Sequence, residues 1–232
     1  MIFSDSTSSF VNYYKRHGFA ATSRRTMLYL QRLFLFPRMV LFYCDLTSPS
    51  FITATKNESN DVSVERKTRE NDIDPQDLQR IVNFWNPKVF RRHLPERFQR
   101  GASLWLIRSA GQLAGYGWTL KGGTIEPHYF MLGSNDVHLF DFLVFPEYRG
   151  RKLNPALVGE ILRQMAAENR SRAYIECAEW NQPQLNSLKK TGFQLLGVAR
   201  KQHLLGQTFV RWENPELQLE TRQTVVSAKA DR

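Results

Sequence analysis

The chain has 232 residues, of which 42% are hydrophobic, and a formal net charge of +10 at pH 7. This length allows one globular domain with extensions, and the charge favours an acidic partner without choosing among nucleotides, carrier proteins, nucleic acids and anionic membranes. Two distant cysteines, Cys44 and Cys177, and no leader-peptide pattern predict a cytoplasmic protein without a disulfide. Two cysteines cannot form a zinc site alone, so we expect no metal.

The first part of the chain is apolar and basic. Ser23 can cap a helix that ends before Pro37, with an apolar face and three arginines lying away from it, Arg24, Arg25 and Arg32. We therefore predict an amphipathic helical extension, 1–37, packed on the domain. The alternative is a helix lying on a membrane surface, and the uncharged runs are too short to span one.

The next elements begin with a buried strand at 39–44. Residues 47–72 are polar and lack periodicity, which predicts a mobile loop. Asp74 then caps a helix with Pro75 in its first turn, and a second helix is predicted at 87–97.

The rest of the chain alternates strands and helices. Strands are predicted at 102–108, 113–120, 136–145 and 173–178, helices at 153–169 and 184–191, and a final hairpin at 193–200 and 202–212. The tail from residue 213 is polar and predicted to be flexible. This order predicts a mixed α/β sheet.

The strand at 136–145 leads into the most informative turn. From His138 to Phe145 it is nearly all apolar, except for His138 and Asp141, and it ends at Pro146. A basic turn, YRGRK (148–152), then leads into the helix at 153. Because a helix N-terminus presents free backbone N–H groups and positive dipole charge, this turn predicts a site for a phosphate-bearing cofactor.

Three motifs in order resemble the GCN5-related N-acetyltransferase (GNAT) superfamily. They are GQLAGYG at 111–117, VFPEYRGR at 144–151, and the segment from Asn181 to Phe193. The resemblance covers about residues 38–212 and implies a mixed, mostly antiparallel sheet flanked by helices. It also implies an acetyl-CoA-dependent N-acetyltransferase that modifies a small-molecule amine. RGRKLNP at 149–155 is similar to a polysaccharide- and capsule-associated branch, which points to an anionic or nucleotide-linked acceptor such as an amino sugar.

The resemblance also assigns the binding of acetyl-CoA. The strand backbone at Phe142, Leu143 and Val144 would pair with the pantetheine arm. Asn181 would form hydrogen bonds either with this arm or with the backbone where the next strand ends. The pyrophosphate would be bound by the loop, whose residues are Arg149, Gly150, Arg151, Lys152, Leu153 and Asn154.

The sequence departs from the family at three positions. Two loop glycines are replaced by Lys152 and Asn154, and Leu188 stands where the family often has a tyrosine acid, which excludes a tyrosine acid there. These losses motivate an alternative function, a catalytically silent CoA-binding or scaffolding module. A nucleic-acid binder is not favoured, because no helix-turn-helix, RNP or zinc pattern accompanies the charge.

Three residues are candidates for the catalytic base. His138 and Asp141 lie on the strand that would carry the thioester, and alternation puts them on opposite faces unless a bulge intervenes. Glu176, on the next strand, is the third candidate, followed by Glu179. Each also has a structural interpretation as a hydrogen-bonded or solvated group.

A basic cluster lies on and after the second predicted helix, which borders the acceptor site in the resembled family. It is either a solvated face or an acceptor site for phosphate or carboxylate, and comprises Arg91, Arg92, His93, Arg97 and Arg100.

Overall fold

The computed structural model describes residues 38–48, 61–84, 87–126, 128–204 and 207–213. The predicted N-terminal helical extension, residues 49–60 of the predicted loop at 47–72 and nearly all of the tail lie outside these residues. In the part of the chain that is described, no helix is both long and apolar enough to cross a bilayer.

One eight-stranded sheet organises the fold, in the order β2-β3-β4-β5-β6-β1-β7-β8. Only β5 and β6 pair in parallel, so the sheet is mixed and mostly antiparallel, as predicted. The strands are β1 (Met39–Asp45), β2 (Val62–Lys67), β3 (Ser103–Ser109), β4 (Gln112–Lys121), β5 (Asp136–Val144), β6 (Arg172–Ala178), β7 (Gln194–Leu204) and β8 (Gln207–Trp212).

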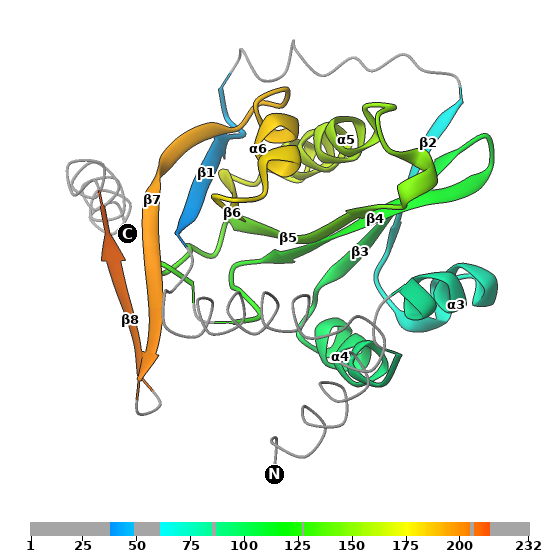
Figure 1. The fold of residues 1–232 in the computed structure, drawn as a ribbon, viewed down its shortest axis with the longest axis horizontal. Coiled ribbons are helices and arrows are strands. Elements are labelled where there is room, and N and C mark those ends of the chain that lie inside the picture. Colours follow the sequence, from blue (N-terminus) through cyan, green and yellow to red (C-terminus); the bar gives the residue numbers. More distant parts are fainter. Residues whose placement is uncertain (1–37, 49–60, 85–86, 127, 205–206, 214–232) are drawn as a thin grey trace, which may run out of the picture.

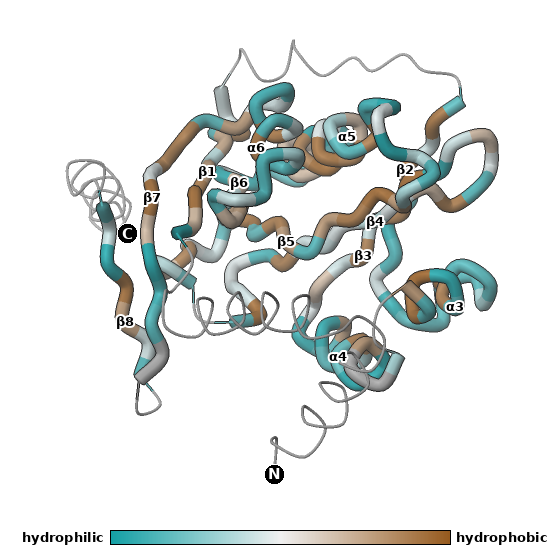
Figure 2. The backbone as a smooth tube through the Cα atoms, viewed as in Figure 1, coloured by the Kyte–Doolittle hydropathy of each residue, from teal (hydrophilic) through white to brown (hydrophobic). Residues whose placement is uncertain are grey.

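Helices cover both faces of the sheet, with α5 and α6 on one side and α3 and α4 on the other (Figure 1). Their bounds are α3 (Pro75–Phe84), α4 (Pro87–Gln99), α5 (Leu153–Ala167) and α6 (Gln182–Leu188), with short 3-10 turns η1 (Glu70–Asp72) and η2 (Pro146–Tyr148). Figure 2 shows hydrophobic residues along β3 to β5 and on the sheet-facing side of α5, where the largest core lies.

The helix predictions agree closely with the structure. The Asp74 side chain accepts a hydrogen bond from the backbone N–H of Gln76 at 2.8 Å, as an N-cap does. Ile81 of α3 and Leu94 of α4 are fully buried against the sheet. Burial of such a side chain contributes about 1.5–3 kcal/mol, which fixes both helices on this face.

The predicted loop at 47–72 is wrong for residues 62–67, which form β2 at the edge of the sheet. β2 pairs antiparallel with β3, and its residues Val62 and Val64 pack against the main core. The polar half of the strand is stabilised by ion pairs, because Arg66 contacts Glu168 at 2.5 Å. Two valines in alternation are a weak signal next to a charged stretch, so tertiary contacts decide this strand.

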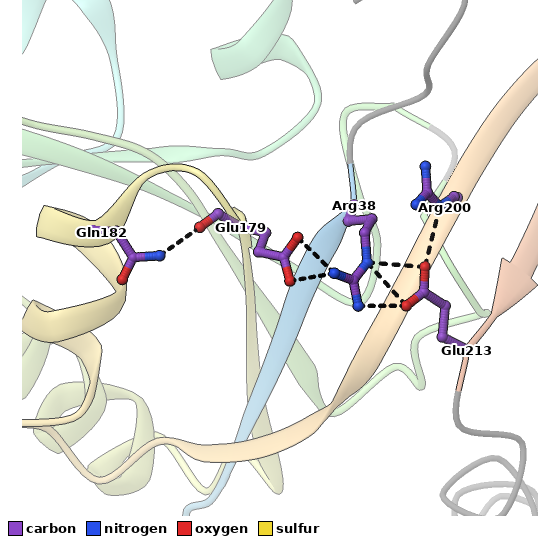
Figure 3. Close-up of polar contacts among 5 residues, drawn as sticks. All are labelled: Arg38, Glu179, Gln182, Arg200 and Glu213. Atoms are coloured by element: carbon purple, nitrogen blue, oxygen red, sulfur yellow. Dashed lines mark hydrogen bonds and ion pairs between the residues drawn. The ribbon is translucent and has the colours of Figure 1, made fainter.

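β1 lies inside the sheet, between β6 and β7, and is antiparallel to both. A polar network holds these strand ends together (Figure 3). Arg38 donates to Glu179 at 2.6 and 2.8 Å and to Glu213 at 2.5 to 3.0 Å, and Arg200 donates to Glu213 at 3.1 Å. Glu179, a candidate base from the sequence, is therefore engaged in this network.

The connection between β4 and β5 packs over the sheet on the side opposite α5. Tyr129 is buried with Leu41, Tyr174 and Leu196, which come from β1, β6 and β7. This connection brings His128 over β5 and β6, where its ring lies edge-on to Tyr129.

Candidate active site

The candidate site lies where β5 and β6 part. Their parallel pairing ends at Leu139 and Ile175, and the remaining residues of β5 have no partner in β6. A groove of about 520 Å³ opens beside this parting, between β5 and the starts of α5 and α6. The unpaired strand edge leaves backbone N–H and C=O groups available for an extended ligand.

A bulge in β5 shapes this edge. Asp141 adopts a left-handed conformation, with φ 50°, and the register between β4 and β5 shifts at Gly117. Phe142 therefore turns toward the α5 side, where its ring packs on Gly117, and a β-carbon at Gly117 would overlap that ring. The bulge predicted as one possibility is present, and it places Asp141 toward α4.

The start of α5 forms one wall of the groove. No side-chain hydrogen bond caps the helix, and its first backbone bond runs from Ala156 to the Lys152 carbonyl at 3.2 Å. Lys152 itself is left-handed, with φ 58°, and Gly150 before it has φ 80°. This turn aims early backbone N–H groups and the positive end of the helix dipole toward the groove, which suits a phosphate group.

Apart from Arg151, every residue predicted for cofactor binding lines this groove, and Arg149 does so while donating to the Val144 carbonyl at 3.3 Å. Arg151 instead lies over the Tyr148 ring and donates to the Glu147 carbonyl at 3.4 Å. Other lining residues were not predicted from the sequence; they are Tyr148, Pro155, Pro183, Gln184, Asn186, Ser187 and Lys190.

Two asparagines connect the walls of the groove. Asn181 caps α6, because its side chain accepts from the Gln184 backbone N–H at 3.4 Å. Asn154, at a position where the family has glycine, bridges α5 to α6 by donating to Ser187 at 2.7 Å and to Gln184 at 3.2 Å. Leu188, which replaces the family tyrosine, is fully buried in the core.

On the opposite face, His138 and Glu176 meet at the point where the strands part. Their neighbours Leu139 and Ile175 belong to the core under α5, so alternation directs His138 and Glu176 to the other side of the sheet. His138 Nε2 lies 2.8 Å from Glu176 Oε2. The two candidates from separate strands therefore form one hydrogen-bonded pair.

His128 completes this cluster, and the sequence analysis did not single it out. Its Nδ1 lies 3.8 Å from Glu176 Oε2, and its ring centre lies 4.8 Å from that of His138. A lone histidine in an irregular connection carries no local pattern, so only the tertiary fold reveals its position. The outer ring nitrogens, His128 Nε2 and His138 Nδ1, are buried and have no hydrogen-bond partner among the described residues.

Burial and charge act together on this cluster. Burial lowers the pKa of His128 to about 4, although the Glu176 charge opposes this shift. Burial alone would raise the pKa of Glu176, but the hydrogen bond from His138 and the charges of His138, His128 and Lys201 outweigh it and lower that pKa. Glu176 is therefore an ionised carboxylate at neutral pH, with 20% of its side chain exposed.

The third candidate base, Asp141, has a different environment. It forms an ion pair with Arg97 of α4, and 51% of its side chain is exposed. The Arg97 guanidinium also lies 5.1 Å from the centre of the Trp118 ring. Of the basic cluster on and after α4, Arg100 donates to the carbonyls of Ile125 and Thr124 at 2.5 and 2.6 Å. These contacts bind α4 to the sheet and to the β4–β5 connection.

The arrangement combines three chemical capabilities. The groove offers an unpaired strand edge and a helix N-terminus, which suit an extended ligand carrying phosphates. The His138–Glu176 pair offers a proton acceptor at the apex of the parted strands, on the α4 side. The sheet thus separates a ligand groove on one face from a proton-accepting pair on the other.

The comparisons with known proteins agree with this geometry. The model of the acetyltransferase (GNAT) family matches residues 69–193, more than half of the chain. No curated protein sequence matches.

Solved structures resemble the chain in fold at low sequence identity. A functionally unknown conserved protein from Staphylococcus epidermidis has a TM-score of 0.51 and 11% identity, over 75% of this chain and 64% of that one. A GNAT acetyltransferase from Colwellia psychrerythraea has a TM-score of 0.48 and 12% identity, over 68% and 53%. This chain thus spans roughly half to two thirds of these structures. The match of the family model, over more than half of the chain, shows that the chain belongs to the acetyltransferase (GNAT) family.

Proposed function

We propose that the protein transfers the acetyl group of acetyl-CoA to the amine of a small acceptor. The observation that carries the proposal is the position of the His138–Glu176 pair at the apex of the parted strands β5 and β6, on the face of the sheet opposite the groove. A donor lying along the free edge of β5 would bring its thioester to that apex. An acceptor would then approach from the α4 side, where the pair can receive its proton.

The residues of the groove fit acetyl-CoA. The left-handed turn at Gly150 and Lys152 and the uncapped start of α5 would hold the pyrophosphate. Arg149 and Lys190, which both line the groove, would add positive charge near phosphate oxygens. The free edge of β5 at 142–144 would pair with the amides of the pantetheine arm.

Each chemical step is then assigned to a residue of the site. The Glu176 carboxylate, the more exposed member of the pair, accepts a proton from the acceptor's ammonium group, and His138 shares it. The freed amine attacks the thioester carbon, and a backbone N–H of the β5 edge stabilises the oxyanion. Because Leu188 replaces the family tyrosine, the departing thiolate takes its proton from the attacking nitrogen.

Asp141 takes a different role in this scheme. Its ion pair with Arg97 leaves a half-exposed carboxylate on the acceptor side, which suits the positioning of an acceptor rather than proton transfer. The basic residues of α4 favour an anionic or nucleotide-linked acceptor, and we keep an amino sugar as the first class to test. Acetyl-CoA as donor and the buried thiols Cys44 and Cys177 fit a cytoplasmic enzyme.

The test begins with CoA binding, measured by calorimetry. We expect Arg149→Ala to weaken binding several-fold, and Arg151→Ala, a matched change outside the groove lining, to leave it nearly unchanged. Equal effects of the two variants, in folded proteins, would contradict the assignment of the groove.

Turnover separates the enzyme from its alternative, a silent CoA-binding module. Purified protein is incubated with acetyl-CoA and a panel of amines that includes amino sugars, their phosphates and their nucleotide-linked forms. Release of CoA thiol together with a product heavier by one acetyl group supports the proposal. Binding of CoA without acetylation of any acceptor would favour the module.

A further inference from the structure

We propose that His128, His138 and Glu176 form a binding site for a divalent transition-metal ion such as Zn²⁺. The three side chains come from the β4–β5 connection, β5 and β6, and their ligating atoms all lie within 4.8 Å of one another. Two imidazoles and one carboxylate are a donor set that Zn²⁺ uses with a fourth, open position. A bound ion would occupy His138 and Glu176, so the proton-acceptor role proposed for this pair belongs to the metal-free protein, and metal binding is tested independently of acetyl transfer.

The distances fit such an ion after a small adjustment. Zn²⁺ bonds of 2.0–2.1 Å in a tetrahedral site put neighbouring ligand atoms about 3.3 Å apart. The His138–Glu176 contact of 2.8 Å and the His128–Glu176 contact of 3.8 Å lie on either side of this value. These two contacts therefore change by only about half an ångström each. The ligating nitrogens of His128 and His138, which lie within 4.8 Å of each other, approach by up to about 1.5 Å, which requires rotation of the His128 side chain.

The hydrogen bonds of the cluster also point to a missing ligand. Glu176 Oε2 is near both rings but forms a hydrogen bond only with His138, since the His128 contact is too long for one. His128, with 4% of its side chain exposed, has no hydrogen bond at either ring nitrogen among the described residues. A buried imidazole in this state is costly, and a metal ion would give its Nδ1 a partner while Nε2 carries the proton.

Charge selects the class of ion. Two neutral imidazoles and one carboxylate carry one negative charge, and nitrogen donors favour transition metals over Mg²⁺ and Ca²⁺, which prefer oxygen. The Lys201 ammonium, 5.1 Å from the centre of the Tyr129 ring, is close enough to influence both Glu176 and His128. Its repulsion opposes metal binding, so its removal is expected to tighten the site.

Binding is tested on the full chain with Co²⁺ as a spectroscopic probe and Zn²⁺ as a competitor. We expect one Co²⁺ per chain with the visible bands of four-coordinate cobalt, displaced by Zn²⁺. His128→Phe keeps an aromatic ring and removes both nitrogens, and Glu176→Gln keeps the size of the side chain and removes the charge. Both are expected to lose the bands, with at least a tenfold weaker affinity.

Two further variants sharpen the experiment. His93→Ala removes a half-exposed histidine of α4 outside the cluster and is expected to leave the bands unchanged. Lys201→Gln is expected to tighten binding several-fold. Wild-type protein that gives no four-coordinate bands, or folded His128→Phe and Glu176→Gln proteins that both retain them, would overturn the proposal. Circular dichroism establishes whether each variant is folded. If either His128→Phe or Glu176→Gln does not fold, the other variant still tests the proposal.

Discussion

Nε2 of His138 lies 2.8 Å from Oε2 of Glu176, although 38 residues separate them in the chain. They meet because β5 and β6 are parallel and adjacent up to the residue where they part. Each side chain alone has an ordinary structural interpretation. Together, at the apex of the parted strands, they form a pair that can share one transferred proton.

Removal of the Glu176 carboxylate tests this pair. Glu176→Gln preserves size and polarity but not the proton acceptor, so we expect kcat to fall by about 10²- to 10⁴-fold with little change in the Kd for acetyl-CoA. The matched control is Glu179→Gln, because Glu179 is bound to Arg38. A large loss for Asp141→Asn with a small loss for Glu176→Gln would instead assign the base to Asp141.

Lys152→Gly is expected to stabilise the fold. Lys152 has φ 58°, a conformation that costs about 1–2 kcal/mol for residues with a β-carbon. Glycine relieves this cost but gains flexibility in the unfolded chain, which leaves a net gain of about 0.5–1 kcal/mol. The thermal midpoint is expected to rise by roughly 1–4 °C. Lys152→Ala, which removes the charge and keeps the strain, is the control; a lower midpoint for the glycine variant would contradict the argument.

Asn154→Gly is expected to have the opposite effect, although both positions hold glycine in the resembled family. The Asn154 amide joins α5 to Ser187 and Gln184 of α6. Loss of these bonds costs about 1–2 kcal/mol and leaves the partners on α6 exposed to the groove. Denaturant unfolding measures the change, and Asn154→Ala separates hydrogen bonding from backbone flexibility. Equal or greater stability in both variants would show that the bridge contributes nothing.

Glu168 gives a pH dependence with a defined sign. Burial opposes its ionisation, but the hydrogen bond from Lys121 and the charges of Arg66 and Lys121 outweigh burial and lower its pKa. Its stabilisation is therefore present above the ordinary glutamate pKa of 4.5 and is lost as the pH falls through the lowered value.

We expect Glu168→Gln to destabilise the protein by up to about 1 kcal/mol at pH 7 and to converge on the wild type in acid. Thermal unfolding across this pH range checks the result. A difference between the two proteins that is constant with pH would exclude titration of Glu168 as its source.

Much of this fold could be predicted from the sequence, because long apolar periods and clear caps define most elements. Asp74 and the apolar face after it are enough for α3, and the hairpin of β3 and β4 is local. β2 was missed because its two valines are followed by charged residues, and only Arg66 meeting Glu168 and the pairing with β3 make it a strand.

The parts of the site that are consecutive in the sequence could be predicted, and the parts that depend on contacts between distant residues could not. The turn at 149–152 and the strand before it were found, because strand, turn and helix are consecutive. The pairing of His138 with Glu176 depends on strand register, and the position of His128 beside this pair depends on how the β4–β5 connection packs. Neither is encoded in local spacing. Gly117, which leaves room for the Phe142 ring, was the available signal for the bulge.

The position of β1 has a consequence for synthesis of the chain. β1 leaves the ribosome first among the described strands, yet Phe42 pairs with Ile175 and with Leu195, both near the other end. Until those residues emerge, an apolar strand with two open edges has no native partner and is a template for intermolecular pairing. Contacts so distant in sequence also slow folding. The nascent chain is therefore at greatest risk of aggregation before β6 and β7 are complete, and a chaperone that shields residues 39–45 would improve the yield of folded protein.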